Sequence, residues 1–169
     1  MGQHEGWLPQ VQKESTQNHM IECPDCNVQE QYVLEQLQVK AEITDKTALA
    51  VIMGNIKQES GFRSNVCEGG AILPYDQCLR GGYGLIQWTT QARYDGLGSF
   101  CKRFDCDPSS LKGQVRYMIN ENQFRAELNS FKTPHQPVPY YMNAASYWLG
   151  WGVFGKREQY SYNYLKRFK

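Results

Sequence analysis

A single carboxylate, Glu59, follows a strongly apolar run in the stretch Gly54–Phe62, which reads GNIKQESGF. In a helix with 3.6 residues per turn, Glu59 lies within about 20° of Ile52, seven positions earlier. It therefore sits at the edge of an apolar stripe made of Leu49, Ile52, Met53 and Ile56. Apolar walls disfavour the charged form of a half-buried carboxyl, which suits a group that donates a proton in catalysis. The alternative is that Glu59 is only the polar end of a core helix.

The helix that carries Glu59 has clear signals at both ends. Asp45 is a good N-cap, because its carboxylate accepts hydrogen bonds from free backbone N–H groups. Gly61 suits the left-handed position that ends a helix, and Phe62 supplies the apolar contact that usually follows. The sequence thus predicts a helix from Asp45 to Ser60, with Glu59 in its last turn.

Other segments show weaker periodic patterns. Apolar spacing predicts helices over 28–40, in the second half of 81–100, over 110–121, over 144–149 and over 156–168. Gly, Pro, Asn and Asp punctuate residues 63–82, which favours a hairpin of short strands or an irregular loop. Residues 132–141 form a loop interrupted by prolines.

Composition limits the class of protein. A chain of 169 residues fits one domain with an added segment at one end. The net charge of +1 leaves no broad nucleic-acid footprint. No apolar run is long enough to span a membrane, and the polar N-terminus lacks the apolar core of a signal peptide. The 11 Tyr, 7 Phe and 4 Trp fit either a cleft for carbohydrate or peptide or a Tyr-rich surface.

The six cysteines fall into three local pairs, Cys23 with Cys26, Cys67 with Cys78, and Cys101 with Cys106. The CPDC spacing of the first pair is that of half a zinc site, and the third pair offers another half. A bridge between Cys67 and Cys78 would close a loop. Free thiols, disulfides and zinc all remain open, because the sequence alone does not choose among pairings.

The ordered motifs resemble those of the phage tail lysozymes and, more broadly, of goose-type lysozymes and lytic transglycosylases. The resemblance rests on GNI..ESGF around Glu59, on GYGLIQW from Gly82 to Trp88 with Arg93 after it, and on the late Arg157. It covers about residues 48–168. It implies an α+β, mostly helical lysozyme-like fold with a small hairpin or loop lobe. We expect this catalytic domain at 41–169, preceded by an N-terminal arm at 1–40.

The resemblance also implies roles for individual residues. Glu59 matches the general acid that protonates the leaving oxygen between N-acetylmuramic acid and N-acetylglucosamine. Ser60 would hydrogen-bond near the acid and the substrate, and Gly84 would allow close backbone approach. Further substrate contacts are expected from Tyr83, Gln87, Trp88 and Tyr164, with Tyr162 as the alternative for the last. The alternative for these residues is a structural role. Gln87, Trp88 and the terminal tyrosines would then be packing residues, and Arg93 would form a structural ion pair.

A second carboxylate decides between two reactions. An inverting hydrolase needs a base that activates water, whereas a lytic transglycosylase uses the 6-hydroxyl of the sugar itself. Glu68 or Asp76 is our candidate for that base, with Asp95 as a further acid in the region. No local motif selects among them, so both reactions stay open.

The expected partners follow from the same resemblance. Peptidoglycan is the substrate, and other tail or baseplate proteins bind residues 1–40. The protein would be carried on a phage tail and act on the host cell wall without a signal peptide. We expect no cofactor in catalysis, and a structural zinc ion at Cys23 and Cys26 is one alternative. A structural baseplate module with the same fold and no activity is the other class of function.

Overall fold

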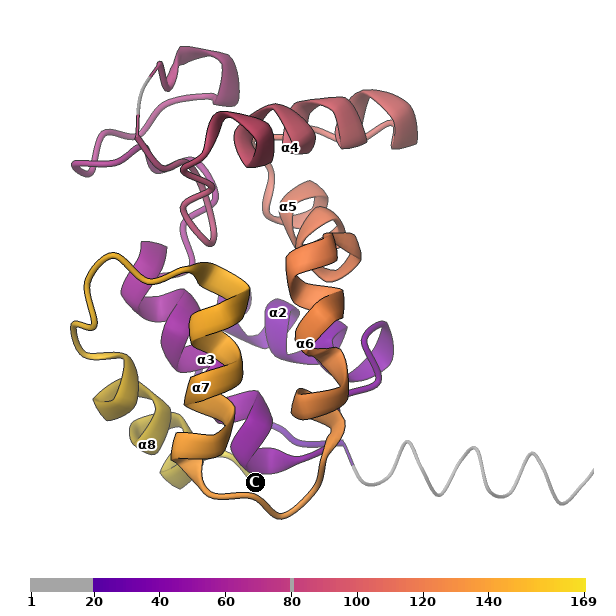
Figure 1. Ribbon diagram of the computed structural model, residues 1–169, viewed down its shortest axis with the longest axis vertical. Coiled ribbons are helices and arrows are strands. Elements are labelled where there is room, and N and C mark those ends of the chain that lie inside the picture. Colours follow the sequence, from indigo (N-terminus) through magenta and orange to yellow (C-terminus); the bar gives the residue numbers. More distant parts are fainter. Residues whose placement is uncertain (1–19, 80) are drawn as a thin grey trace, which may run out of the picture.

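The structure is a computed structural model that describes residues 20–79 and 81–169, and these residues are mostly helical (Figure 1). They form seven α-helices and one short 3-10 helix. The prediction of a mostly helical fold is confirmed. Figure 1 shows loops and α4 at the top and the remaining helices below them.

Helix α3 (Lys46–Ser60) is the central element of the body. Asp45 accepts a hydrogen bond from the Ala48 N–H at its start, and Gly61 ends it in the left-handed conformation, as predicted. Every residue from 48 to 56 is buried. Helix α8 (Arg157–Arg167) packs along α3 more extensively than any other helix. The two helices pack so closely at Gly54 that a Cβ atom there would collide with Ser161.

Helix α2 (Val28–Val39) lies in the predicted N-terminal arm but packs on the body. It begins with a capping box between Asn27 and Glu30. Its Val33 and Leu37 are fully buried, and it contacts α3 and α5. The segment before α2 is also tied down, since Glu22 and Lys169 exchange two backbone hydrogen bonds. Residues 20–40 therefore pack against the body rather than extending from it, and residues 1–19 of the predicted arm lie outside the described residues.

Helices α6 (Asn122–Lys132) and α7 (Val138–Leu149) pack against each other beside α3. No helix was predicted over α6, and the helix predicted at 144–149 begins earlier, at Val138. Pro139 lies in the first turn of α7, where proline costs no hydrogen bond. Between the two helices, the ring of Trp148 meets the rings of Phe124 and Phe131 edge-on.

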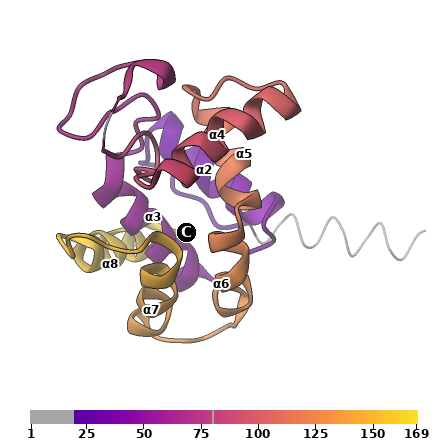
Figure 2. The same ribbon diagram turned by 45° about the horizontal axis from the view of Figure 1, so that its top comes forward.

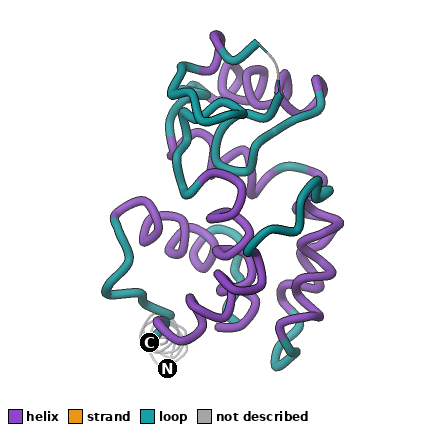
Figure 3. Tube along the Cα trace, turned by 90° about the vertical axis from the view of Figure 1, so that its left-hand side faces the viewer, coloured by secondary structure: helices purple, strands orange, loops and turns teal. Residues whose placement is uncertain are grey.

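Residues 63–79 and 81–90 form what we call the loop lobe, which lies above the body with α4 (Gln91–Phe104) and α5 (Leu111–Asn120) beside it (Figure 2). Apart from the 3-10 helix Tyr75–Gln77, the lobe is loop, as the colouring in Figure 3 shows. Its β-structure consists of isolated bridges, Val66 with Ile72 and Tyr83 with both Cys67 and Trp88. The predicted hairpin of strands is not confirmed for the described residues.

All six cysteines are in disulfides, each within its own local pair. Cys67–Cys78 closes the long loop of the lobe, as the sequence allowed. The sulfurs that the zinc alternative needs, from Cys23, Cys26, Cys101 and Cys106, are bonded in pairs in this structure. No helix among the described residues is both long and apolar enough to cross a membrane.

Candidate active site

A cleft of about 630 Å³ separates the loop lobe from the body. Its walls come from the last turn of α3, the loop lobe, the start of α4, the end of α7 and the segment that leads into α8. The charged side chains that line it are Glu59, Glu68, Arg93 and Arg157. The cleft thus brings together groups from most of the chain around the predicted acid.

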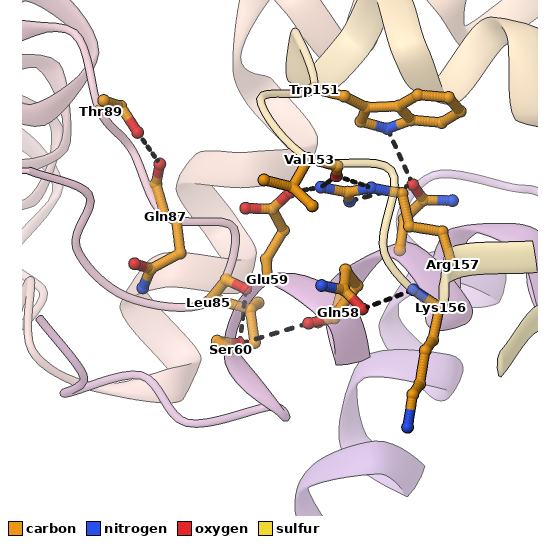
Figure 4. Close-up of polar contacts among 12 residues, drawn as sticks. Gln58, Glu59, Ser60, Leu85, Gln87, Thr89, Trp151, Val153, Lys156 and Arg157 are labelled. Atoms are coloured by element: carbon orange, nitrogen blue, oxygen red, sulfur yellow. Dashed lines mark hydrogen bonds and ion pairs between the residues drawn. The ribbon is translucent and has the colours of Figure 1, made fainter. Parts of the chain in front are cut away.

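Glu59 reaches this cleft from the last turn of α3, and its side chain is 16% exposed. Its carboxylate forms an ion pair with the Arg157 guanidinium, with 2.6 Å between Oε2 and Nη2 (Figure 4). The expectation that Glu59 faces apolar walls alone is therefore corrected. The stripe of α3 continues into the body, while Glu59, one turn further on, meets the first residue of α8.

Arg157 is held by a polar network that the helix wheel of α3 does not predict. Its Nε and Nη2 donate to the Val153 carbonyl, at 3.1 and 3.0 Å. Its Nη1 donates to Asn55 Oδ1 at 3.3 Å, and the same oxygen accepts from the indole N–H of Trp151 at 3.0 Å. The guanidinium also lies over the Trp151 ring, 5.3 Å from its centroid. Two sequence signals for this network were present, Asn55 as the polar residue inside the apolar run of α3 and Arg157 as the late arginine of the resemblance.

Of the candidates for a second carboxylate, Glu68 shares the cleft with Glu59. Its side chain extends from the loop lobe, and its Oε2 accepts the Gly82 N–H at 3.1 Å. Asp76 and Asp95 line a different pocket of about 320 Å³, beside Tyr75 and Tyr94. Geometry therefore favours Glu68 over the other two.

Three residues of the predicted motifs hold the loop lobe in place. The Ser60 hydroxyl donates to the Leu85 carbonyl at 2.6 Å, joining the end of α3 to the lobe. Gly84 has φ +79 and packs so tightly on Gln114 that a Cβ atom would collide with it. The Gln87 amide lines the cleft and donates to the Val66 and Gly84 carbonyls. The close approach to Gly84 is thus made by the protein's own side chain.

The predicted aromatic contacts lie in the interior. Tyr83, Trp88 and Tyr164 are each 0% exposed. The Tyr83 hydroxyl donates to the Leu73 carbonyl, and Trp88 Nε1 donates to Glu121. Tyr164 donates to Glu30 of α2, and burial raises its pKa. Fully buried rings offer no face to a sugar, so the structure places these residues in positioning roles, while Tyr162 is 45% exposed outside the cleft.

Arg93 forms a structural ion pair, which was the alternative that the sequence analysis gave for it. It pairs with Glu121 through two contacts of 2.8 Å, and Glu121 is 5% exposed. The exposed aromatic of the cleft is instead Tyr147 of α7, at 71%. Tyr147 and Gln123 line the cleft without any motif around them, so sequence reasoning had no reason to select them.

A helical body whose central helix presents a carboxylate to a cleft fits a lysozyme-like protein. A sequence model of the phage tail lysozyme family matches residues 29–150, and the chain belongs to this family. Membership implies a virion-associated phage protein that breaks down peptidoglycan. No curated protein and no solved structure matches the chain. The match starts upstream of the predicted resemblance and includes α2 except for its first residue, Val28, whereas Arg157 lies beyond the end of the match.

Proposed function

We propose that the protein is a muramidase of a phage tail that hydrolyses the β-1,4 bond between N-acetylmuramic acid and N-acetylglucosamine. The observation that carries the proposal is the cleft, which collects Glu59 and Glu68 from two separate segments and leaves Asp76 and Asp95 outside. Two carboxyl groups beside one bond are what glycoside hydrolysis requires.

In this reaction Glu59 donates its proton to the oxygen of the leaving sugar. A water molecule attacks the anomeric carbon, and the Glu68 carboxylate accepts the proton that this water loses. The hydrogen bond from Gly82 orients one Glu68 oxygen, so the other is the base. The exposed ring of Tyr147 provides a flat face against which a sugar can stack.

Binding to other tail or baseplate proteins through residues 1–40 is part of the same proposal. Within this segment, α2 exposes two apolar side chains, Val28 at 78% and Val39 at 51%. Local opening of the host wall during genome entry is the role that fits such an attachment. Crosslinking within purified virions tests it, and crosslinks that avoid residues 1–40 contradict it.

Mass spectrometry of the fragments released from purified peptidoglycan tests the reaction. We expect fragments with reducing ends. Fragments with 1,6-anhydro ends indicate a lytic transglycosylase, and the absence of any fragment at all pH values indicates a structural module without activity.

The variants Glu68→Gln and Asp76→Asn form a matched pair for the second carboxylate. We expect Glu68→Gln to lower the rate about 10²- to 10⁴-fold, as for loss of a general base. Asp76→Asn removes an equivalent charge outside the cleft and should keep the rate. Equal rates for the two variants contradict the role of Glu68.

A further inference from the structure

Glu68, the proposed base, is an exposed side chain on a loop, and the rotatable bonds of such a side chain do not fix its position. An inverting hydrolase nevertheless holds its two carboxyl groups at a separation of about 6.5–9.5 Å. The Glu68 carboxyl must therefore be held by its neighbours. The contacts that hold it are made at Gly81 and Gly82.

We propose that Gly81 and the Cys67–Cys78 disulfide position Glu68 for catalysis, because the space left by the missing side chain of Gly81 holds the Glu68 carboxyl in the orientation of a base. The inference rests on the proposed function, since it concerns how Glu68 takes the proton of the attacking water. Gly81 is a positioning residue in this account, because it acts on the reaction through Glu68.

The Glu68 side chain fills the space into which a side chain at residue 81 would extend. A Cβ atom on Gly81 would lie 1.9 Å from Glu68 Oε2 and 2.7 Å from Glu68 Cβ, both shorter than the contacts that Cβ atoms make in proteins. The Gly82 N–H donates to the same Oε2 at 3.1 Å. A side chain at residue 81 would therefore push Oε2 away from this donor and displace Oε1, the oxygen that takes the proton.

The backbone on both sides of this contact is tied together. The Glu68 N–H donates to the Gly82 carbonyl at 2.8 Å. The disulfide joins Cys67, the residue before Glu68, to Cys78, which lies three residues before Gly81. The segment that carries Glu68 and the segment that carries the two glycines are thus linked by a hydrogen bond and by a covalent bond. A collision at residue 81 is therefore relieved by the Glu68 side chain more readily than by the backbone.

This arrangement predicts a large effect on rate and a small one on stability. Glu68 is exposed, so its displaced carboxyl can turn toward solvent without leaving a buried group unpaired. The same displacement takes the base away from the water, and an error of about 1 Å in the position of a catalytic group can cost about 10²-fold in rate. Gly81 lines the pocket that contains Asp76, whereas Glu68 lines the cleft, so substrate binding should change little.

The variants Gly81→Ala and Gly70→Ala form a matched pair within the loop lobe. Both glycines have positive φ, +77 and +99, so alanine strains the backbone at either position. No described atom outside the adjacent residues lies within 4 Å of a Cβ atom at Gly70. With soluble peptidoglycan strands as substrate, we expect Gly81→Ala to lower kcat about 10- to 100-fold with KM nearly unchanged, and Gly70→Ala to keep both. Equal kcat values for the two folded variants overturn the proposal.

Sodium azide separates a displaced base from a general structural fault. The azide anion has no proton to lose, so it attacks the anomeric carbon without a base. A carbon–nitrogen bond forms, the electron pair of the broken carbon–oxygen bond stays on the leaving oxygen, and Glu59 protonates that oxygen. We expect azide to raise the rate of Gly81→Ala at least about tenfold, with glycosyl azide ends in the mass spectrum, and to leave Glu59→Gln slow. A Gly81→Ala rate that azide leaves unchanged overturns the proposal.

The disulfide provides a second variant if Gly81→Ala does not fold. Cys67→Ser combined with Cys78→Ser keeps Gly81 and the Glu68 side chain but removes the covalent bond beside Glu68. We expect a lower kcat, a nearly unchanged KM and recovery of the rate with azide. A folded double variant with the kcat of the wild-type protein overturns the proposal.

The proposed function fails separately from this inference. A wild-type protein without turnover, products with 1,6-anhydro ends, or a Glu68→Gln variant as fast as Asp76→Asn overturns both. A slow Glu68→Gln variant beside a Gly81→Ala variant as fast as Gly70→Ala overturns only the positioning of Glu68 by Gly81.

Discussion

The helical body and the loop lobe face each other across the cleft, yet different forces hold them. The middle of α3 is buried on all sides among apolar side chains. The lobe buries fewer apolar side chains, Tyr83, Leu85 and Trp88 among them, and is also held by side chains bonded to backbone, such as Ser60 to Leu85 and Gln87 to Val66, and by the Cys67–Cys78 disulfide. Apolar burial is non-directional and supplies most of the free energy of folding, whereas hydrogen bonds are directional and fix the positions of the groups that they join. The body should therefore determine stability, and the lobe should determine the geometry of the cleft.

The largest effect on stability is expected in the body. Ile52→Ala removes a fully buried side chain from the centre of α3 and should lower the free energy of unfolding by about 2–5 kcal/mol. Urea denaturation measures this, and Ile52→Val is the control, with an expected loss of about 0.5–1.5 kcal/mol. Folded Ile52→Ala should still cleave peptidoglycan at a similar rate. A loss as small as that of the control would show that the body is not the main source of stability.

A substitution at the foot of the lobe should affect activity more than stability. Gln114 of α5 accepts the Leu85 N–H at 2.8 Å and donates to the Ser64 and Pro108 carbonyls at 2.6 and 2.8 Å. Gln114→Leu leaves these groups unpaired, which should cost about 1–3 kcal/mol and loosen the segment around Gly84.

The rate of peptidoglycan cleavage, measured beside the urea midpoint, tests the role of Gln114. The exposed Lys112 on the same helix supplies the control, Lys112→Ala, which should change neither quantity. A Gln114→Leu protein that is destabilised but cleaves normally would contradict the division between body and lobe.

The smallest effect is expected on thermal stability at alkaline pH, through two tyrosines beside the lobe. Burial raises the pKa of Tyr94 from 10.0 to about 12, and the neighbouring Tyr75, Tyr83 and Asp76 add to this shift. Burial also raises the pKa of Tyr117 to about 12. The folded state prefers both phenols neutral, so their contribution is complete below pH 10.0 and is lost as pH rises from there toward about 12. Thermal unfolding should shift to lower temperature in this window. Tyr94→Phe should flatten the dependence, and an unchanged slope would show that Tyr94 does not titrate with unfolding.

The same contrast explains what the sequence could predict. Helix α3 was predicted with both ends because Asp45, the apolar stripe and Gly61 all act locally. Helix α6 was missed although Phe124, Leu128 and Phe131 are spaced along one face, so this signal was present. The lobe has no such period, because its shape comes from bonds between distant residues such as Gln114 and Ser64.

The candidate site also contains features that the sequence predicted and features that only the structure revealed. The placement of Glu59 at the cleft followed from its helix, and the choice of Glu68 over Asp76 required the cleft itself. The ion pair with Arg157 joins residues far apart in the chain, which no spacing rule reaches. Tyr83 and Trp88 stand beside a motif glutamine, but only their burial shows that they support the lobe instead of touching a sugar.

The measurement that tests the central claim most directly is the rate at which Glu59→Gln cleaves purified peptidoglycan, relative to the wild-type protein. The amide oxygen still accepts a hydrogen bond from Arg157, and circular dichroism identifies conditions in which both proteins are folded. We expect the rate to fall at least about 100-fold, as for loss of a general acid. A folded Glu59→Gln variant that cleaves peptidoglycan at the wild-type rate would contradict the assignment of Glu59 and of the cleft around it.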